Sequence, residues 1–156
     1  MKAPLETTGF AASPSTNVVR GILFSILVLG CLLRFFGVQF GLPYQFHADE
    51  PIVVNHALAY GSGDLHPHFF RIPPLTSYVL FILFGFYYLL GSLGGLFSGL
   101  REFESLFLTD PSSFYFVGRL FLGSFIGTLS LWVFHRLVIR VADWEKGLAA
   151  VFFFAV

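Results

Sequence analysis

Residues 21–33, GILFSILVLGCLL, decide the class of fold, because they carry no charge and stand between Arg20 and Arg34. With their flanks they form an apolar run over residues 18–38. About 20 apolar residues are enough for a helix to cross a bilayer. Arg34 then lies near one end of the run, where its side chain can reach the headgroups or an acidic partner. We therefore expect a membrane-spanning helix over this run.

Three further apolar runs follow the first one. The 29 residues between Arg71 and Arg101 are uncharged and begin near Pro73 and Pro74, which suit a helix start. A helix ending at residue 156 would leave backbone carbonyls unsatisfied in lipid, so the sequence predicts the N-terminal fragment of a longer protein. The expected spans are residues 18–38, 117–137 and a truncated 147–156, with a hydrophobic helix over 74–92 that is either juxtamembrane or spanning.

The composition agrees with an all-α polytopic membrane protein. Hydrophobic residues make up 56% of the chain and charged residues 12%, and nine Lys and Arg balance nine Asp and Glu. A soluble domain carries about 25% charged residues. These values exclude a soluble globular domain, a disordered chain and a nucleic-acid binder. Cys31 is the one cysteine, so the chain can build neither an internal disulfide nor a thiolate zinc cluster. Residues 1–17 are expected to be a disordered cytoplasmic tail.

The Lys and Arg residues outside the apolar runs predict which side of the membrane each loop faces. If helix 74–92 stays out of the bilayer, the tail and segment 135–146 share one side and hold five cations, against two on the other side. If helix 74–92 spans, the inside holds three and the outside four. The positive-inside rule favours the first arrangement. We therefore expect a multi-pass plasma-membrane protein whose large first exterior loop, with its juxtamembrane helices, contains the segment 41–71.

That exterior segment holds most of the residues that can carry chemistry. Pro51 suits a first helical position, and Gly61-Ser62-Gly63 suits a helix end, so a short amphipathic helix is expected between them. Asp49 and Glu50 would lie at its N-terminus, where the helix dipole favours carboxylates. One of these carboxylates could act as a base or hold a cation while the other orients an arginine.

Simpler roles for the same residues stay open at this point. An acidic pair at the start of a helix more often stabilises the helix N-terminus than takes part in a reaction. Arg71 could anchor at the headgroups. The four histidines of the segment permit a divalent cation without requiring one, because their spacing matches no compact metal motif. These histidines are His47, His56, His66 and His68.

Several stretches resemble the N-terminal part of the type C membrane glycosyltransferases that use polyprenyl-phosphate sugars. The similarity is closest to the protein O-mannosyltransferase and aminoarabinose-transferase-like branch. The stretches are LRFFGVQFGLPYQFHADE (33–50), GDLHPHFFRIPPL (63–75), VGRLFLGSFIGTLSLWVFHRL (117–137) and WEKGLAAVFFFAV (144–156). The acidic pair combined with GDL, PPL and R-x3-G-S-x2-G-T-L at these distances carries the resemblance.

The resemblance implies roles for individual residues. Asp49 matches the first-loop aspartate that acts as a base or positions the acceptor, Glu50 is its partner in a catalytic pair, and His47 precedes them. Ala48 stands where a proline is common. The other positions that it places at the substrate are Asp64, His66, His68, Arg71 and Arg119.

The function implied is transfer of a sugar from a polyprenyl-phosphate donor to a hydroxyl of a protein, lipid or glycan, with inversion. The family's second acidic motif and its later cationic residues are absent from this chain, so the fragment is not expected to turn over by itself. Two other functions stay open. A transporter or ion relay would more often bury its charges mid-span, and a non-catalytic membrane scaffold would tolerate alanine at the clustered carboxylates.

Overall fold

The computed structural model describes residues 15–44 and 47–156, which form helices and turns and contain no strand. The expected all-α class is therefore confirmed. The helices are α1 (Thr16–Phe36), α2 (Asp49–Ala59), the 3-10 turn η1 (Tyr60–Ser62), α3 (Leu75–Leu93), α4 (Leu100–Thr109), α5 (Ser112–Arg119), the π-helical η2 (Leu120–Ile126), α6 (Gly127–Val138) and α7 (Trp144–Ala155).

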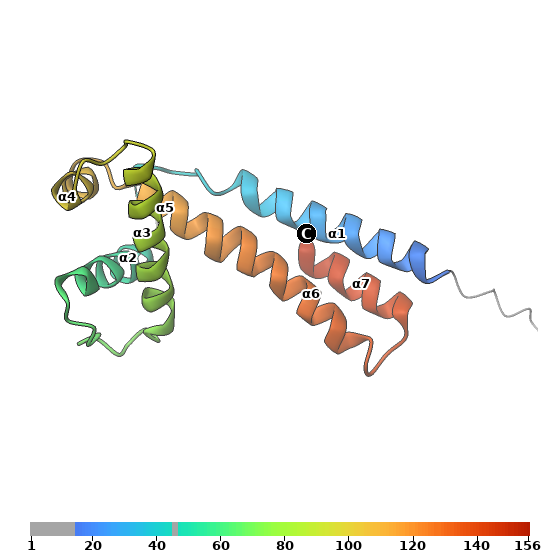
Figure 1. Cartoon of the computed structure of the whole chain (residues 1–156). Coiled ribbons are helices and arrows are strands. Elements are labelled where there is room, and N and C mark those ends of the chain that lie inside the picture. The colour runs from blue at the N-terminus through green and yellow to red at the C-terminus, as the bar shows by residue number, and fades with distance from the viewer. Residues whose placement is uncertain (1–14, 45–46) are drawn as a thin grey trace, which may run out of the picture.

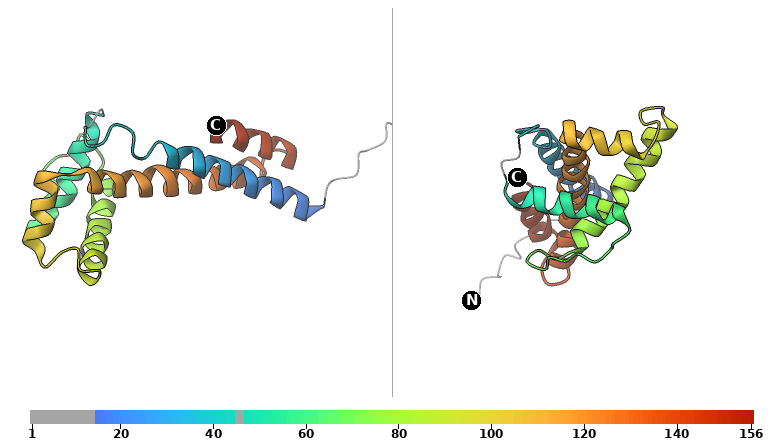
Figure 2. Two further views of the ribbon diagram at one scale, coloured as in Figure 1. Left: turned by 90° about the horizontal axis from the view of Figure 1, so that it is seen from above. Right: turned by 90° about the vertical axis from the view of Figure 1, so that its left-hand side faces the viewer.

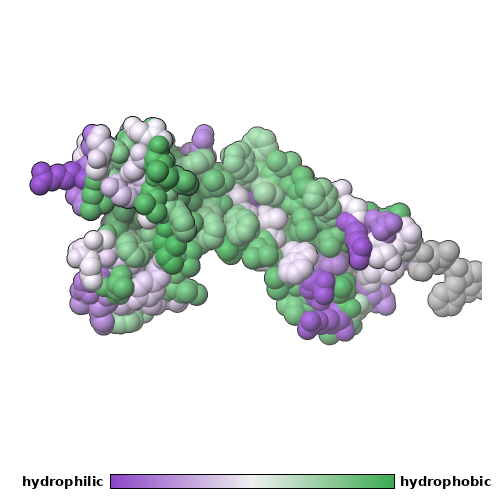
Figure 3. All heavy atoms as spheres, viewed as in Figure 1, coloured by the Kyte–Doolittle hydropathy of each residue, from purple (hydrophilic) through white to green (hydrophobic). Residues whose placement is uncertain are grey.

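Three helices are long and apolar enough to cross a membrane. They are α1, α3 and one continuous helix of 27 residues, Ser112–Val138, which is made of α5, η2 and α6. We call the last one the long helix. Large apolar side chains remain exposed along these helices. On the face drawn in Figure 3, a hydrophobic band covers the middle of the molecule, and hydrophilic residues gather toward its two ends. The expected membrane character is supported by these helices.

The helices form two groups that differ in direction (Figure 1). Helix α1 and the long helix run side by side, and α7 packs against both, so these three form the bundle. Helices α2, α3 and α4 gather at the end of the bundle where α1 ends and α5 begins, and we call this group the cap. Figure 2 shows that α3 runs steeply across the long axis of the bundle rather than along it.

The bundle is held by close helix packing. Its hydrophobic core consists of Ile26, Leu131, Leu148, Val151 and Ala155. Gly30 of α1 lies so near α6 and α7 that a Cβ atom there would be 2.7 Å from a Leu131 methyl group and 3.2 Å from the Ala155 Cβ. Small residues at such contacts let helix backbones approach in lipid. Arg34 finds its partners in backbone carbonyls rather than an acid, since Nη1 donates to the oxygens of Gly30 and Ala155 at 3.0 and 3.1 Å.

The core of the cap is aromatic. Phe103 of α4 lies between Phe97 and Phe114, with ring centroids 5.2 and 4.9 Å away. Phe84 of α3 meets Phe114 edge-on at 5.4 Å. No helix was expected between residues 97 and 116, yet α4 forms there. It forms because Phe103, with Leu106 and Phe107 three and four positions later, presents one apolar face to this core.

Helix ends differ from the expected ones by a few residues. Helix α2 begins at Asp49, so Pro51 lies in its third position rather than its first. Proline is tolerated there, because the amide groups of the first turn have no partner within the helix. Gly63, with φ of +93°, closes η1 as expected. Residues 1–14 of the expected tail lie outside the described residues, and Thr16 and Asn17 already belong to α1.

Candidate functional site

A cavity of about 850 Å³ lies where the cap meets the bundle. This volume is in the range of small-molecule sites. Its polar and charged lining residues are Arg34, His47, Asp49, Glu50, Thr76 and Arg119. The remainder of the lining is apolar, aromatic or glycine, and comprises Leu33, Gly37, Val38, Phe40, Val53, Val54, Leu80, Tyr115, Gly118, Leu122 and Gly123. The cavity is therefore polar toward the start of α2, and between α1 and the long helix its lining is apolar apart from Arg34.

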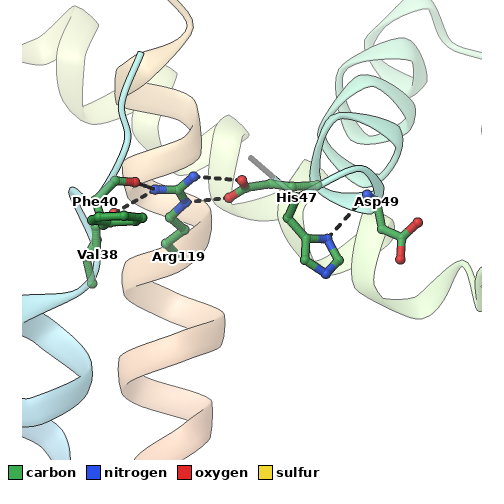
Figure 4. A network of polar contacts seen from close by, with 6 residues as sticks. Val38, Phe40, His47, Asp49 and Arg119 are labelled. Carbon is green, nitrogen blue, oxygen red and sulfur yellow. Dashed lines mark hydrogen bonds and ion pairs between the residues drawn. The ribbon is translucent and has the colours of Figure 1, made fainter. Parts of the chain in front are cut away.

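Arg119 of the long helix clamps three segments together at the polar end (Figure 4). Its Nε and Nη2 donate to the two carboxylate oxygens of Glu50 at 2.5 and 2.7 Å. Its Nη1 donates to the carbonyls of Phe40 and Val38, just after α1, at 2.7 and 3.1 Å. The Arg119 and Glu50 side chains are each 19% exposed. All three guanidinium nitrogens and both Glu50 oxygens are thus engaged, and the forked geometry fixes where α2 starts.

Asp49 differs from its neighbour in having a carboxylate without a partner among the residues that the structure describes. It occupies the first position of α2, is exposed and lines the cavity. Figure 4 shows its carboxylate turned away from Arg119. Its backbone N–H donates to Nδ1 of His47 at 3.3 Å. Because Nδ1 accepts this hydrogen bond, a proton on a neutral His47 ring lies on Nε2, which is then available as a donor.

Four of the other expected site residues lie outside this cavity. Asp64, His66 and His68 form an exposed group after η1, which we call the loop cluster. Oδ2 of Asp64 is 2.7 Å from Nε2 of His68, and Oδ1 accepts the backbone N–H of His66 at 2.9 Å. The hydrogen bond from His68 is the main reason why the pKa of Asp64 is lowered. These contacts all lie within the loop itself.

Arg71 follows the loop cluster, and its side chain is exposed. Within residues 15–44 and 47–156 it has no hydrogen bond or ion pair. The eleven residues of α2 separate the start of that helix from the loop that follows it, a length of about 16 Å at 1.5 Å per residue. The structure therefore divides the expected site. His47, Asp49, Glu50 and Arg119 come together, whereas Asp64, His66, His68 and Arg71 lie at the far end of α2.

The described residues contain no group of three or more His, Cys, Asp or Glu side chains that could hold a metal ion. In the loop cluster, two of the three side chains already satisfy each other, since Asp64 and His68 are directly hydrogen-bonded. The divalent cation that the sequence permitted has no ready set of ligands in this part of the chain.

Part of the cavity was not anticipated from the sequence. Gly118, Leu122 and Gly123 line it together with Arg119, and Leu33 and Gly37 line it from α1. The spacing of three and four residues in each set places its members on one helix face. That spacing was the available signal, but glycines in an apolar run suit helix packing equally well.

No family model, curated protein or solved structure matches this chain. The glycosyltransferase resemblance noted above therefore remains a prediction, and the site has to be interpreted from its own geometry.

Proposed function

We propose that the chain belongs to an integral-membrane glycosyltransferase that moves a sugar from a polyprenyl-phosphate carrier to an acceptor hydroxyl, with Asp49 as the base. One observation carries the proposal. A single cavity holds an exposed carboxylate, which has no partner among the described residues, at the start of α2, and between the long apolar helices its lining is apolar apart from Arg34. A ligand that fits both ends has a polar head and a hydrocarbon tail.

The direction of the helices supports a membrane placement with the cap at one surface. If α1 and the long helix cross the bilayer, the direction of α3 across their common axis favours a position of α3 along the membrane surface. Such an apolar helix is suited to the interface. Its outward side chains Ile82, Phe86, Leu89 and Leu93 are exposed and lie three or four positions apart. On this placement α3 is a juxtamembrane helix and does not span.

The cationic residues indicate which surface the cap occupies. Arg136, Arg140 and Lys146 lie at or near the turn between α6 and α7, and Arg20 lies near the start of α1. Both regions are at the end of the bundle opposite the cap (Figure 1). The positive-inside rule then assigns that end to the cytoplasm. Asp49 would accordingly face the exterior of the plasma membrane, where a sugar has to arrive on a lipid carrier.

The proposed reaction is a direct displacement. The acceptor hydroxyl oxygen attacks the anomeric carbon, and its proton passes to a carboxylate oxygen of Asp49. The bond between the anomeric carbon and the phosphate oxygen breaks, and its electron pair leaves with the polyprenyl phosphate. One displacement inverts the anomeric centre and needs no second nucleophile. The acceptor can be a hydroxyl of a protein, lipid or glycan.

The charges around Asp49 are compatible with its proposed role as the base. Glu50 is neutralised by Arg119, so it holds α2 in place rather than competing for the proton. A cation for the leaving phosphate can come from Arg34, which lines the cavity. His47 can donate a hydrogen bond from Nε2 to a sugar hydroxyl or a phosphate oxygen. Asp64, His66 and His68 are left for contacts with the acceptor beyond the cavity.

Sugar transfer by the native protein to which the chain belongs, measured in its own membranes with radiolabelled polyprenyl-phosphate sugars, tests the proposal. We expect Asp49→Asn to lower kcat by about 100-fold or more, because a positioned base contributes 10²–10⁴-fold. The matched control is Glu104→Gln, which neutralises an exposed carboxylate of the cap that does not line this cavity. The control is expected to stay within twofold of the wild type. An Asp49→Asn protein with wild-type turnover would contradict the proposal.

A further inference from the structure

A second cavity, of about 470 Å³, lies within the cap between α2, α3 and α4. We call it the cap cavity, and none of its lining residues also lines the cavity at Asp49. Figures 1 and 2 show α2 and α4 on the side of α3 that is turned away from the bundle. On the membrane placement proposed above, that side of α3 faces water rather than hydrocarbon. A ligand therefore reaches the cap cavity from solution.

Aromatic rings from two helices line the cap cavity. The rings belong to Phe81, Phe84, Tyr88, Phe103 and Phe107. Tyr88 and Phe103 stand at 65° to each other with their centroids 5.4 Å apart, so they form a corner of the cavity wall. Phe103 and Phe107 also pack against the buried ring of Phe114, with centroids 4.9 and 5.1 Å away. These contacts with the core of the cap hold the rings in place before any ligand binds.

Glu104 places a carboxylate on the apolar face of α4. Leu100 and Leu108 lie four positions before and after it, so the three side chains share one side of the helix, and all three line the cap cavity. Glu104 is exposed and has no hydrogen bond or ion pair within the part of the chain that the structure describes. Its neighbour Glu102, by contrast, accepts the backbone N–H of Ser98 at 2.6 Å. No lysine, arginine or histidine of the described residues lines the cap cavity, so its lining carries a net negative charge.

We propose that the cap cavity binds an organic cation, an ammonium group with apolar substituents, between its aromatic rings and Glu104. The face of an aromatic ring attracts a cation, and cages of such rings recognise quaternary ammonium groups. An inorganic divalent cation would require several oxygen ligands, whereas a single carboxylate lines this cavity. A neutral apolar ligand would make no use of Glu104. The site is separate from the cavity proposed for sugar transfer, and Glu104 touches none of the reacting atoms.

The experiment compares two probes of the same shape, choline and 3,3-dimethylbutan-1-ol, in which a carbon atom replaces the charged nitrogen. Equilibrium dialysis measures the binding of each radiolabelled probe to the native protein to which the chain belongs, purified in a detergent without choline groups. We expect the wild type to bind choline about tenfold more tightly than the alcohol, because only choline gains from the ring faces and the carboxylate.

Three variants test the charge, the ring and the location of the site. Glu104→Gln is expected to weaken choline binding about fivefold and to leave binding of the alcohol within about twofold. Tyr88→Leu, which keeps an apolar side chain but removes the ring, is expected to weaken choline binding about threefold. Gly85 lines the cavity, and a Cβ atom there would meet nothing within 4 Å. Gly85→Leu therefore fills the cavity and is expected to weaken binding of both probes.

Two matched controls keep these comparisons specific. Glu145→Gln neutralises an exposed carboxylate of α7 outside the cap cavity, and Gly21→Leu adds a side chain at an open position of α1. Both are expected to bind choline like the wild type, as is Asp49→Asn, so a failure of the proposed sugar transfer leaves this test intact.

Three results would overturn the proposal. The first is that the wild type binds no choline, and the second is that it binds both probes equally well, as an apolar ligand site would. The third is that Glu104→Gln or Gly85→Leu binds choline as tightly as the wild type.

Discussion

The two ends of α2 carry similar residues in very different settings. At its start, Glu50 is paired with Arg119 of the long helix, 69 positions away in the sequence, and Asp49 lines a cavity with no partner among the described residues. Beyond its end, Asp64 bonds to His68, four positions away in the same loop. Carboxylates and histidines alone therefore do not distinguish the two regions. The two regions differ in the long-range ion pair between Arg119 and Glu50, which fixes the carboxylate next to Asp49.

The largest predicted effect is the loss of stability when Arg119, which holds Glu50, is replaced. Arg119→Met leaves the mostly buried Glu50 carboxylate and two backbone carbonyls without their donor. We expect it to lower the free energy of unfolding by about 3 kcal/mol, because breaking one side of a buried ion pair is costly. Arg71→Met, on an exposed arginine, should stay within about 0.5 kcal/mol. Denaturant titration of the purified protein in detergent measures both values.

The pairwise nature of the clamp can be tested with a double substitution. Glu50→Gln combined with Arg119→Met should be less destabilising than the sum of the two single changes, since neither charge is then left alone. Strict additivity would show that Glu50 and Arg119 do not stabilise the protein through each other.

A smaller effect is expected on activity from the loop cluster. Asp64→Asn removes the charge and one of the two acceptor oxygens of Asp64 but does not alter the lining of the cavity. We expect kcat to stay near the wild-type value and kcat/KM to fall by less than tenfold, which corresponds to less than about 1.4 kcal/mol. Steady-state transfer assays with varied acceptor concentration separate the two constants. A loss of kcat as large as that of Asp49→Asn would place the chemistry at the loop cluster instead.

The smallest effect concerns the pH dependence of the loop. The hydrogen bond from His68 lowers the pKa of Asp64, so the stability that the Asp64 carboxylate contributes is fully present above the ordinary Asp pKa of about 3.9 and is lost as the pH falls through the lowered value. Carboxyl-carbon NMR titration of labelled protein should give a midpoint below that ordinary value. His68→Asn should move the midpoint back toward it. An unchanged midpoint in His68→Asn would show that His68 is not the cause.

Several helices and their ends could be predicted from the sequence, because they depend on patterns within a few neighbouring residues. The uncharged run at residues 21–33 predicted α1, and Pro73-Pro74 predicted the start of α3. Gly61-Ser62-Gly63 predicted the end of the helix that begins at the acidic pair. Each of these signals acts within a few residues, through hydropathy, a fixed proline φ angle or a glycine turn.

The remainder depends on contacts between distant residues, which no local pattern encodes. Helix α4 has an amphipathic spacing at Phe103, Leu106 and Phe107, but the rings that its apolar face packs against, Phe97 and Phe114, lie outside the helix. The division of the expected site arises because Arg119 binds Glu50 rather than residues of the loop cluster. The cavity wall at Gly123 depends on how closely α1 approaches the long helix, which the spacing of glycines alone does not fix.

The most direct test of the central claim is the side of the membrane from which position 49 can be reached. Asp49→Cys in a Cys31→Ser background is treated, in intact cells, with a maleimide that cannot cross membranes, and Lys146→Cys serves as the reporter for the opposite end. We predict that position 49 reacts in intact cells and is protected by added polyprenyl phosphate, and that position 146 reacts only after permeabilisation. Reaction of position 49 only after permeabilisation would contradict an exterior site for sugar transfer.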